Sequence, residues 1–259
     1  MPANGALLSL QSCTVRFGGL TALSEFSLAL QAGELVSLIG PNGAGKTTVF
    51  NAITGVHALS EGAIRFDGRL VSGLPPHRIA RLGIGRTFQN IRLFRGLTVL
   101  DNLRAAMHQD GDYGFLRAAM RSRRWAATEA RLESSAVELL TMFDLQDRAA
   151  ELAGGLPYGD QRRLEIVRAL ATRPQLLLLD EPAAGMNPAE TVHLMELIRS
   201  LRERFSLTVL LIEHDMRVVM GISGRVVVLN NGRQIAAGSP QEITHDPAVV
   251  EAYLGEPSH

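Results

Sequence analysis

The stretch LVSLIGPNGAGKTT, residues 35–48, decides the fold class. It opens with the apolar run LVSLI, as in a buried strand, and residues 47–53 then have the pattern of a helix that stops before Gly55. Between the two, GPNGAGKTT (40–48) fits the pattern G-x-x-x-x-G-K-T. Its glycines allow successive backbone N–H groups to turn towards phosphate oxygens, and the start of the helix adds a favourable field. The sequence therefore predicts a phosphate-binding loop between a strand and a helix.

The residues of this loop are candidates for binding a nucleoside triphosphate. They are Gly40, Pro41, Asn42, Gly43, Ala44, Gly45, Lys46, Thr47 and Thr48. Lys46 is expected to reach the β- and γ-phosphates, and the Thr47 hydroxyl is expected to ligate Mg²⁺. A glycine-rich turn with an incidental lysine is the alternative interpretation. The Lys-Thr pair in register, with a strand before it and a helix after it, favours nucleotide binding.

A second apolar run ends in two carboxylates. In LLLLDEP (176–182), four leucines typical of a strand buried on both faces of a parallel sheet precede Asp180 and Glu181. Ligands of such sheets bind at the carboxyl ends of the strands. We therefore expect Asp180 to hold Mg²⁺, directly or through water, and Glu181 to polarise the attacking water. The alternative is a simple turn that caps the next helix, and the phosphate-binding loop elsewhere in the chain argues against it.

A third apolar strand, LTVLLIE (207–213), leads into His214. A histidine at this position could hydrogen-bond the γ-phosphate and hold Glu181 and the water in line. A histidine at the end of a strand is more often a structural residue. The order of the three segments, first the phosphate-binding loop, then the acidic strand and then this strand, favours a catalytic role.

Strands and helices alternate in the rest of the chain. A helix is expected over 189–205, between the acidic strand and the strand that precedes the histidine, and this alternation implies a mainly parallel sheet. Helical patterns replace strand patterns between about residues 89 and 161, which predicts a helical lobe inserted into the core. The dipeptides DG (67–68) and NG (231–232) predict two β-hairpins.

Composition and charge exclude several classes of protein. The 259 residues include 26 basic and 26 acidic ones, so the net charge of zero gives no indication of nucleic-acid binding. The single cysteine, Cys13, excludes an internal disulfide framework and fits a reducing compartment. The start of the chain lacks the pattern of a secretory signal. No window approaches the about 18 to 20 apolar residues that cross a bilayer, so a role at a membrane would require a partner.

The segment LPYGDQRRLEIVRAL (156–170) contains no nucleophile, histidine or metal-ligand spacing, and its function follows from its neighbours. In the chain it is the third of five motifs. It follows the loop 40–48 and TFQN (87–90), and it precedes LLLLDEP (176–182) and IEHD (212–215). Five such motifs in this order resemble the ATP-binding-cassette (ABC) ATPases, over nearly the whole chain. The resemblance implies ATP hydrolysis with Mg²⁺ as the cofactor.

The resemblance also implies a fold and a domain organisation. The expected fold is α/β, with a P-loop NTPase (RecA-like) parallel-sheet core, an antiparallel β subdomain and an inserted α-helical subdomain. The whole chain, 1–259, is expected to form a single ABC ATPase domain. Within it, 7–88 and 166–230 would form the antiparallel β subdomain and the core, 89–165 the helical subdomain, and 231–259 a hairpin strand and tail.

In ABC ATPases a segment like 156–160 is the signature loop. Two cassettes associate head to tail, and each signature loop covers the γ-phosphate in the phosphate-binding loop of the other cassette. By this resemblance Pro157, Tyr158 and Gly159 are candidate nucleotide contacts. The residue types also support contact with a phosphate. Gly159 allows the phosphate to approach the backbone closely, and 160–170 has the pattern of a helix whose N-terminus favours an anion.

This signature loop departs from the family pattern of Leu-Ser-Gly-Gly-Gln. Pro157 replaces the serine, Tyr158 replaces a glycine and Asp160 replaces the glutamine. Contact with phosphate must therefore rest on backbone N–H groups, and we expect Asp160 to point away from the anion. A heterodimer with one stronger and one weaker site would account for these departures, and so would coupling that relies on the loop of the partner.

The resemblance assigns three further residues. Phe17 stands where an aromatic ring stacks on adenine, and the alternative is a core phenylalanine on a strand. Gln89 matches the glutamine that senses Mg²⁺ and water and that links the cassette to the membrane partner. It is therefore a candidate both for catalysis and for the metal site. Asn187 stands where an aspartate is common; followed by Pro188 and Glu190, it is predicted mainly to cap a helix.

Within the family, several stretches resemble one ATPase subunit of branched-chain amino-acid importers. They include GIGRTFQNIRLFRGLTVLDNL (83–103), DEPAAGMNP (180–188) and VVEAYLG (249–255). The implied partners are a second ABC ATPase subunit in a homo- or heterodimer, two transmembrane permease subunits and, indirectly, a periplasmic solute-binding protein, with no nucleic acid. The implied location is the cytoplasmic face of the inner (plasma) membrane, reached through the permease subunits.

Two other functions are open to an ABC cassette. One is a soluble ATPase that powers an assembly scaffold of the iron–sulfur cluster type. The other is an ATPase that drives transport of lipid or lipopolysaccharide. The importer-like segments 86–103 and 156–170 favour transport of a small polar solute over the scaffold.

Overall fold

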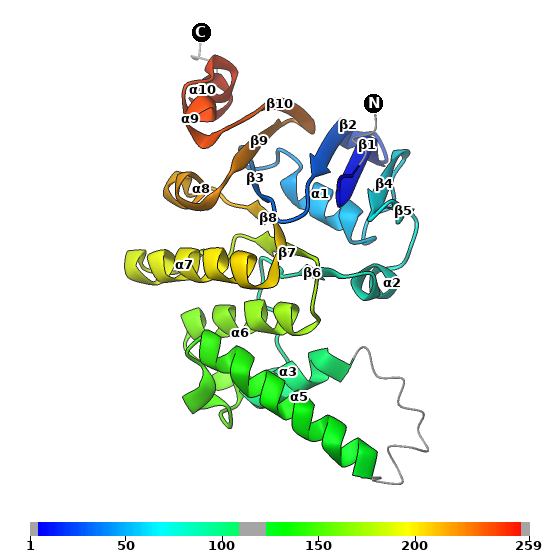
Figure 1. Ribbon diagram of the computed structural model, residues 1–259. Coiled ribbons are helices and arrows are strands. Elements are labelled where there is room, and N and C mark those ends of the chain that lie inside the picture. The colour runs from blue at the N-terminus through cyan, green and yellow to red at the C-terminus, as the bar shows by residue number, and fades with distance from the viewer. Residues whose placement is uncertain (1–4, 109–122, 255–259) are drawn as a thin grey trace. The chain divides into compact units, whose positions relative to one another are not determined.

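The computed structural model describes residues 5–108 and 123–254. The chain divides into two compact units, Met1–Arg86 with Gln175–His259 and Thr87–Pro174. Figure 1 labels the elements of both. The second boundary falls nine residues later than the sequence suggested, because helix α6 (Tyr158–Ala171) is one continuous element and a boundary after residue 165 would divide it.

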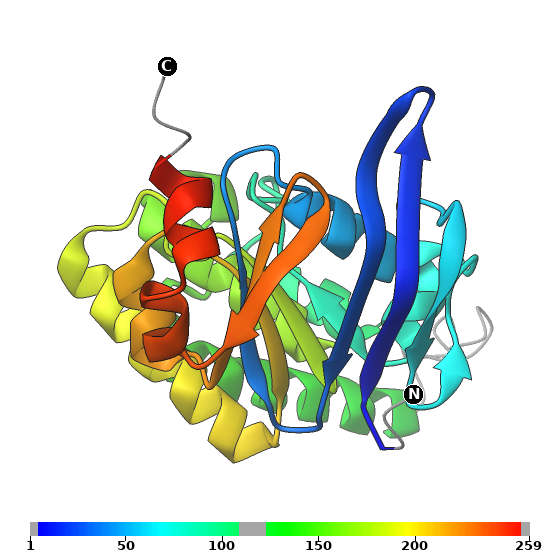
Figure 2. The same cartoon turned by 90° about the horizontal axis from the view of Figure 1, so that it is seen from above.

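A six-stranded sheet forms the centre of the first unit, with the order β10-β9-β3-β8-β7-β6. Its strands are β3 (Leu35–Ile39), β6 (Ile84–Arg86), β7 (Leu176–Asp180), β8 (Thr208–Ile212), β9 (Arg225–Asn230) and β10 (Arg233–Gly238). All neighbours pair in parallel except β10, which runs antiparallel to β9. Figure 2 shows these strands from above. The predicted mainly parallel sheet is confirmed.

The central strands of this sheet are buried along their whole length. Every residue of β3, β7 and β8 is buried, which explains why their sequences are continuous apolar runs without alternation. The short strand β6 was not predicted, because three residues with a glycine in the middle show no strand pattern.

An antiparallel sheet of four strands, with the order β2-β1-β4-β5, completes the β structure of the first unit. Its strands are β1 (Leu8–Phe17), β2 (Leu20–Leu30), β4 (Glu61–Phe66) and β5 (Arg69–Leu70). Both predicted hairpin turns are present: Asp67 and Gly68 have φ of 48° and 72°, and Asn231 and Gly232 have φ of 46° and 76°. Positive φ at both central residues is the geometry that Asp-Gly and Asn-Gly favour.

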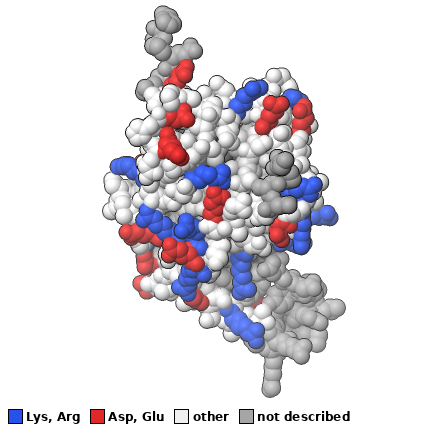
Figure 3. All heavy atoms as spheres, turned by 45° about the horizontal axis from the view of Figure 1, so that its top comes forward, with Lys and Arg blue, Asp and Glu red and all other residues white. Residues whose placement is uncertain are grey.

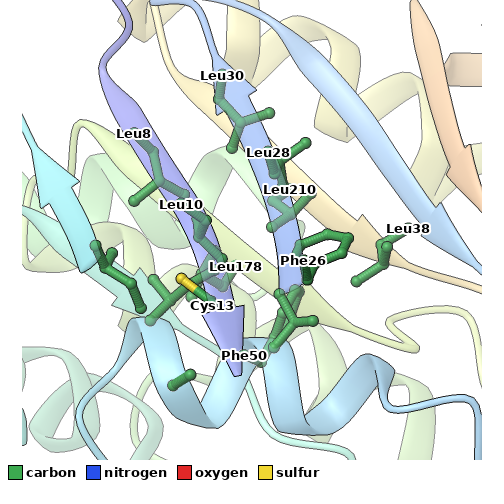
Figure 4. Close-up of a cluster of buried hydrophobic side chains, with 14 of the residues drawn as sticks. Leu8, Leu10, Cys13, Phe26, Leu28, Leu30, Leu38, Phe50, Leu178 and Leu210 are labelled. Atoms are coloured by element: carbon green, nitrogen blue, oxygen red, sulfur yellow. The ribbon is translucent and has the colours of Figure 1, made fainter. Parts of the chain in front are cut away.

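The main hydrophobic core lies between the two sheets and helix α1 (Lys46–Ile53), as Figure 4 shows. Its labelled side chains come from β1 (Leu8, Leu10, Cys13), β2 (Phe26, Leu28, Leu30), the parallel sheet (Leu38, Leu178, Leu210) and α1 (Phe50). Burial raises the pKa of the Cys13 thiol, which has no exposed surface. The only cysteine of the chain is therefore an apolar core residue.

Helices flank the parallel sheet of the first unit. They are α1, α2 (Pro76–Arg81), α7 (Pro188–Phe205), α8 (Met216–Ile222), α9 (Pro240–Thr244) and α10 (Pro247–Leu254). A smaller cluster joins the C-terminal helices to the sheet, because Ile243 of α9 and Val249 of α10 pack with Ile39 at the end of β3. The C-terminal segment is thus part of the same core as the strand that leads into the phosphate-binding loop.

The second unit is helical. Its main helices are α3 (Val99–Met107), α5 (Arg123–Met142) and α6 (Tyr158–Ala171), with short 3-10 turns at Gln146–Arg148 and Ala153–Gly155. Helix α3 packs against both α5 and α6. The buried residues of this unit include Ala136, Leu140, Phe143, Leu164 and Val167, which recur at the spacing of a helix face.

Within 5–108 and 123–254, no helix is long and apolar enough to cross a bilayer. Basic and acidic side chains are interspersed on the face shown in Figure 3, in line with the net charge of zero.

Asn187 caps helix α7. Its side-chain oxygen accepts a hydrogen bond from the Glu190 backbone N–H at 3.0 Å, and the Glu190 carboxylate accepts one from the Asn187 backbone N–H at 2.9 Å. This reciprocal pair is a capping box, followed by proline at the first helical position. It satisfies one N–H group of the first turn that the helix itself cannot satisfy.

We expect Asn187→Ala to lower the free energy of unfolding by about 1 kcal/mol, because the cap is lost. In a chain of this size the midpoint of thermal unfolding should fall by about 2–4 °C. Asn187→Asp, which keeps the acceptor oxygen, is the matched control and should unfold near the wild-type temperature. Equal midpoints for the alanine and aspartate variants would show that the cap contributes nothing to stability.

Candidate functional site

The loop 40–48 wraps around the side chain of its own lysine. Lys46 begins α1 and is only 8% exposed. Its Nζ donates to the carbonyl oxygens of Gly40 at 2.6 Å and Pro41 at 2.9 Å. The loop can turn in this way because Gly40, Gly43 and Gly45 have φ of 148°, 81° and 103°, conformations that side chains rarely allow.

Two glycines of the loop also permit its close packing on neighbouring strands. A Cβ at Gly40 would lie 2.0 Å from the carbonyl oxygen of Leu229 on β9, and one at Gly45 would lie 2.6 Å from the carbonyl oxygen of Ala22 on β2. Both contacts are with backbone atoms, which cannot move away as the end of a side chain can. The loop is therefore fixed from outside in a shape that suits an anion bound to backbone N–H groups.

Strand register brings the candidate catalytic groups level with the phosphate-binding loop. Leu38 of β3 pairs with Ile212 of β8, and Asp180 of β7 pairs with the same Ile212. The three strands therefore end side by side, and the residues that follow them share one edge of the sheet. This edge is where parallel sheets bind ligands.

The electrostatics around Lys46 link the loop to the two carboxylates. Burial lowers the pKa of the Lys46 ammonium, while the carboxylates of Glu181 and Asp180 act in the opposite direction. The three charges therefore interact within one site. An anion bound beside Lys46 would add a second favourable partner for its buried charge.

Asp180 is held by an arginine that the sequence analysis did not identify. Asp180 is 2% exposed, and its Oδ2 lies 3.4 Å from Nη2 of Arg86 at the end of β6. Nη1 of Arg86 also donates to Asn51 at 2.8 Å and to Thr54 at 3.0 Å, both in or next to α1. The signal in the sequence was an arginine directly after LGIG (82–85), but the partners of Arg86 are 32 to 94 residues away in the chain.

Glu181 and His214 face each other at the edge of the sheet. Nδ1 of His214 lies 3.7 Å from Oε1 of Glu181, and their side chains are 61% and 19% exposed. The backbone N–H of Glu181 donates to the carbonyl oxygen of Ile212 at 2.9 Å, which ties the residue to the neighbouring strand. Glu181 has φ of 48°, in the left-handed region that a glutamate rarely adopts.

Glu213 is a second charged residue whose role the sequence did not indicate. Its two carboxylate oxygens accept hydrogen bonds from the backbone N–H groups of Ala183 and His214, both at 3.1 Å. Burial raises the pKa of Glu213, which is 1% exposed, and these N–H groups oppose that rise. Glu213 therefore joins the turn after Glu181 to the segment that holds His214.

Phe17 lies at the end of β1 with its side chain 45% exposed. Its ring packs edge-on against that of His57, with centroids 4.9 Å apart. The alternative interpretation of Phe17 as a core residue is therefore wrong. An exposed aromatic ring is available for stacking on a planar ligand.

The candidate signature residues form the start of α6 in the second unit. The helix begins at Tyr158, two residues before the expected start, with Pro157 as its N-cap residue. Tyr158 is 47% exposed. The carboxylate of Asp160 pairs with Arg163, and it lies 3.3 Å from Nε of Arg148. Arginines of the same unit thus neutralise the charge that would oppose an anion.

Gln89, the last predicted site residue, lies in the second unit between β6 and α3. The first unit brings together the loop 40–48, Asp180, Glu181 and His214, and the second contains Gln89 and the residues 157–159.

The donor chemistry of the first unit suits Mg²⁺. Among the described residues, no group of three or more histidine, cysteine, aspartate or glutamate side chains could hold a metal ion by itself. The oxygens of Thr47 and Asp180 are the ligand type that Mg²⁺ prefers, and Thr47 is exposed in the first turn of α1. Such a partial set fits an ion that completes its shell with phosphate oxygens and water.

Comparison with protein families gives two matches. The family model described as ABC transporter matches residues 23–184, which is more than half of the chain. A second model, described as branched-chain amino acid ATP-binding cassette transporter, matches residues 233–259.

Individual proteins match along nearly the whole chain. The "High-affinity branched-chain amino acid transport ATP-binding protein LivG" of Salmonella typhimurium is 48% identical over 250 residues, which cover 96% of this chain and 98% of the relative. BraF of Pseudomonas aeruginosa, which has the same description, shows the same identity and coverage. A crystal structure of an ATP-binding cassette of an ABC transporter in its ADP conformation superposes with a TM-score of 0.83 at 30% identity, covering 97% of this chain and 99% of that one.

Proposed function

The chain belongs to the ABC transporter family, and on this basis we propose that it is the ATP-hydrolysing subunit that powers import of branched-chain or related amino acids. One observation carries the proposal: 48% identity over 96% of the chain to relatives named as ATP-binding proteins of branched-chain amino acid transport. The match of residues 233–259 to the branched-chain cassette model supports the same solute class. Neither the scaffold ATPase nor the lipid-transport ATPase is favoured by these relatives.

In this proposal the first unit binds the triphosphate. The loop 40–48 surrounds the phosphates with backbone N–H groups, and Lys46 exchanges its two carbonyl partners for phosphate oxygens. The exposed ring of Phe17 stacks on the adenine. Among the residues of the loop, Lys46 makes the largest electrostatic contribution, because its ammonium is buried.

Glu181 is the residue that activates water. It accepts a hydrogen bond from the attacking water and polarises it towards the γ-phosphate, and His214 at 3.7 Å holds Glu181 and the water in line. Glu213 positions both residues through the backbone of Ala183 and His214. Thr47, Asp180 and Gln89 would hold Mg²⁺, which when bound neutralises charge on the phosphates.

We propose further that two cassettes are needed for each reaction. The start of α6, with Pro157, Tyr158 and Gly159, offers backbone N–H groups at a helix N-terminus. A second subunit, either a copy of this chain or a sibling, would present these groups to the γ-phosphate in the loop 40–48. ATP would then close the pair of cassettes, and loss of the γ-phosphate would reopen it.

The proposed membrane partners are two transmembrane permease subunits, with a periplasmic solute-binding protein acting on their other side. The chain would be peripheral to the cytoplasmic face of the inner membrane. Gln89 and the loop around it would transmit closure of the cassettes to the permeases.

Purification from native membranes and transport in vesicles test this function. The chain should co-purify with two multi-spanning subunits and a second cassette. Vesicles that contain this complex should take up leucine when ATP and the solute-binding protein are supplied, and Glu181→Gln should abolish uptake. Isolation with a soluble scaffold instead, or uptake of lipid but no amino acid, would refute the proposal.

A further inference from the structure

A buried ion pair stands in the middle of α6. Arg162 and Glu165, one helical turn apart, have side chains that are 0% and 1% exposed, and Nη1 of Arg162 lies 2.8 Å from Oε2 of Glu165. Removing two charges from water is costly, and an apolar pair of similar volume is often equally stable. Stability alone therefore does not explain the pair.

The partners of the two side chains point to another role. Nη1 and Nη2 of Arg162 donate to the backbone carbonyl oxygens of Phe88 at 2.7 Å and Gln89 at 2.9 Å. Oε1 of Glu165 accepts hydrogen bonds from the backbone N–H groups of Phe88 at 3.3 Å and Arg92 at 3.1 Å. The pair thus holds the main chain before, at and after Gln89.

This main chain is a loop. Residues 87–94 form neither helix nor strand, so their backbone groups have no regular hydrogen-bond ladder. Hydrogen bonds from a charged donor or to a charged acceptor are about twice as strong as neutral ones. Arg162 and Glu165 therefore substitute for secondary structure around Gln89.

We propose that Arg162 and Glu165 are positioning residues that join the loop of Gln89 rigidly to the signature helix. Arg162 lies one turn after Tyr158, so residues 158–165 of α6 and the backbone of 88–92 form one body within the second unit. A phosphate that engages the start of α6 would thereby also set the position of Gln89. This inference rests on the proposed role of Gln89 in hydrolysis.

The double variant Arg162→Met/Glu165→Leu tests the connection in the full-length chain. It replaces the whole pair with apolar side chains, so it should remain folded. By hydrogen–deuterium exchange, we expect the amides of Phe88 and Arg92 to exchange at least about 10-fold faster than in the wild type, while those in the middle of α3 and α6 keep their protection.

A matched control is available in the same unit. Arg104→Met/Glu129→Leu removes an ion pair of 3.0 Å that links α3 to α5, outside residues 88–92. This control should leave the exchange of Phe88 and Arg92 unchanged. Wild-type exchange of these two amides in Arg162→Met/Glu165→Leu would overturn the inference, as would equal acceleration in the control.

A kinetic cycle in the assembled transporter separates this inference from the proposed function. Arg162→Met/Glu165→Leu should lower kcat about 10- to 100-fold, because Gln89 is misplaced. It should not change ATP affinity measured without Mg²⁺, and adding Gln89→Ala should cause no further loss. Wild-type kcat in the double variant, with kcat lowered by Gln89→Ala alone, would overturn the positioning role. Wild-type kcat in Gln89→Ala would overturn the role of Gln89 itself, whatever the exchange experiment shows.

Discussion

Glu181→Gln is expected to lower the rate of ATP hydrolysis at least about 100-fold, because an amide cannot accept a proton from water. Glutamine has nearly the same shape as glutamate, so the backbone anchor of residue 181 to Ile212 should persist. The loop 40–48 is untouched, and ATP should still bind. We therefore expect the variant to accumulate as an ATP-bound dimer, which size-exclusion chromatography with ATP and Mg²⁺ would detect.

Glu203→Gln is a suitable control for this experiment, because Glu203 is a glutamate whose side chain is 74% exposed at the end of α7. It should hydrolyse ATP at the wild-type rate and show no stable dimer. If Glu181→Gln also turned over at the wild-type rate, another residue would have to activate the water. If it failed to bind ATP, the residue would belong to the binding site rather than to the chemistry.

Lys46→Ala should weaken ATP binding at least about 100-fold. Hydrogen bonds to charged groups contribute about 1.5–3 kcal/mol each, and a factor of 100 corresponds to about 2.7 kcal/mol. Lys46 is the buried cation of the phosphate-binding loop, and no other lysine or arginine donates to the carbonyl oxygens of Gly40 and Pro41 in the described structure. Titration calorimetry with Mg²⁺ and ATP would measure the loss.

Thermal unfolding without nucleotide controls for damage to the fold. Burial disfavours the charged form of Lys46, so its removal should cost little stability in the unliganded chain. We expect the midpoint to stay within about 3 °C of the wild type, and the increase that ATP causes in the wild type to be absent. Unchanged ATP affinity in Lys46→Ala would refute the assignment of the loop to phosphate binding.

Much of the fold could be predicted because its signals are local. The phosphate-binding loop needs glycines at fixed positions, buried parallel strands need continuous apolar runs, and two-residue hairpins need dipeptides such as Asn231-Gly232. Each requirement is met within about ten residues of sequence. The candidate residues Asp180, Glu181 and His214 could be found for the same reason, since each lies at the end of an apolar strand or within two residues after it.

The supporting contacts of the site could not be predicted, because they join distant parts of the chain. Arg162 is a charged residue within a helical pattern, and the two carbonyl oxygens that it binds lie 73 and 74 residues before it. Arg86 likewise meets Asp180 across 94 residues. A charged side chain on a helix is usually exposed, and only the folded chain shows which of them are enclosed. The start of α6 was placed two residues late because Tyr158 and Gly159 are weak helix formers.

Because the backbone of Glu181 is left-handed, a substitution that raises thermal stability at this position would also abolish ATP hydrolysis. A residue other than glycine in this conformation costs about 1 kcal/mol. Glycine there would relieve the cost and remove the carboxylate together. A laboratory selection for thermal stability alone would therefore enrich inactive variants with glycine at position 181. Directed evolution of this protein for thermal stability must therefore also select for ATP hydrolysis in each round.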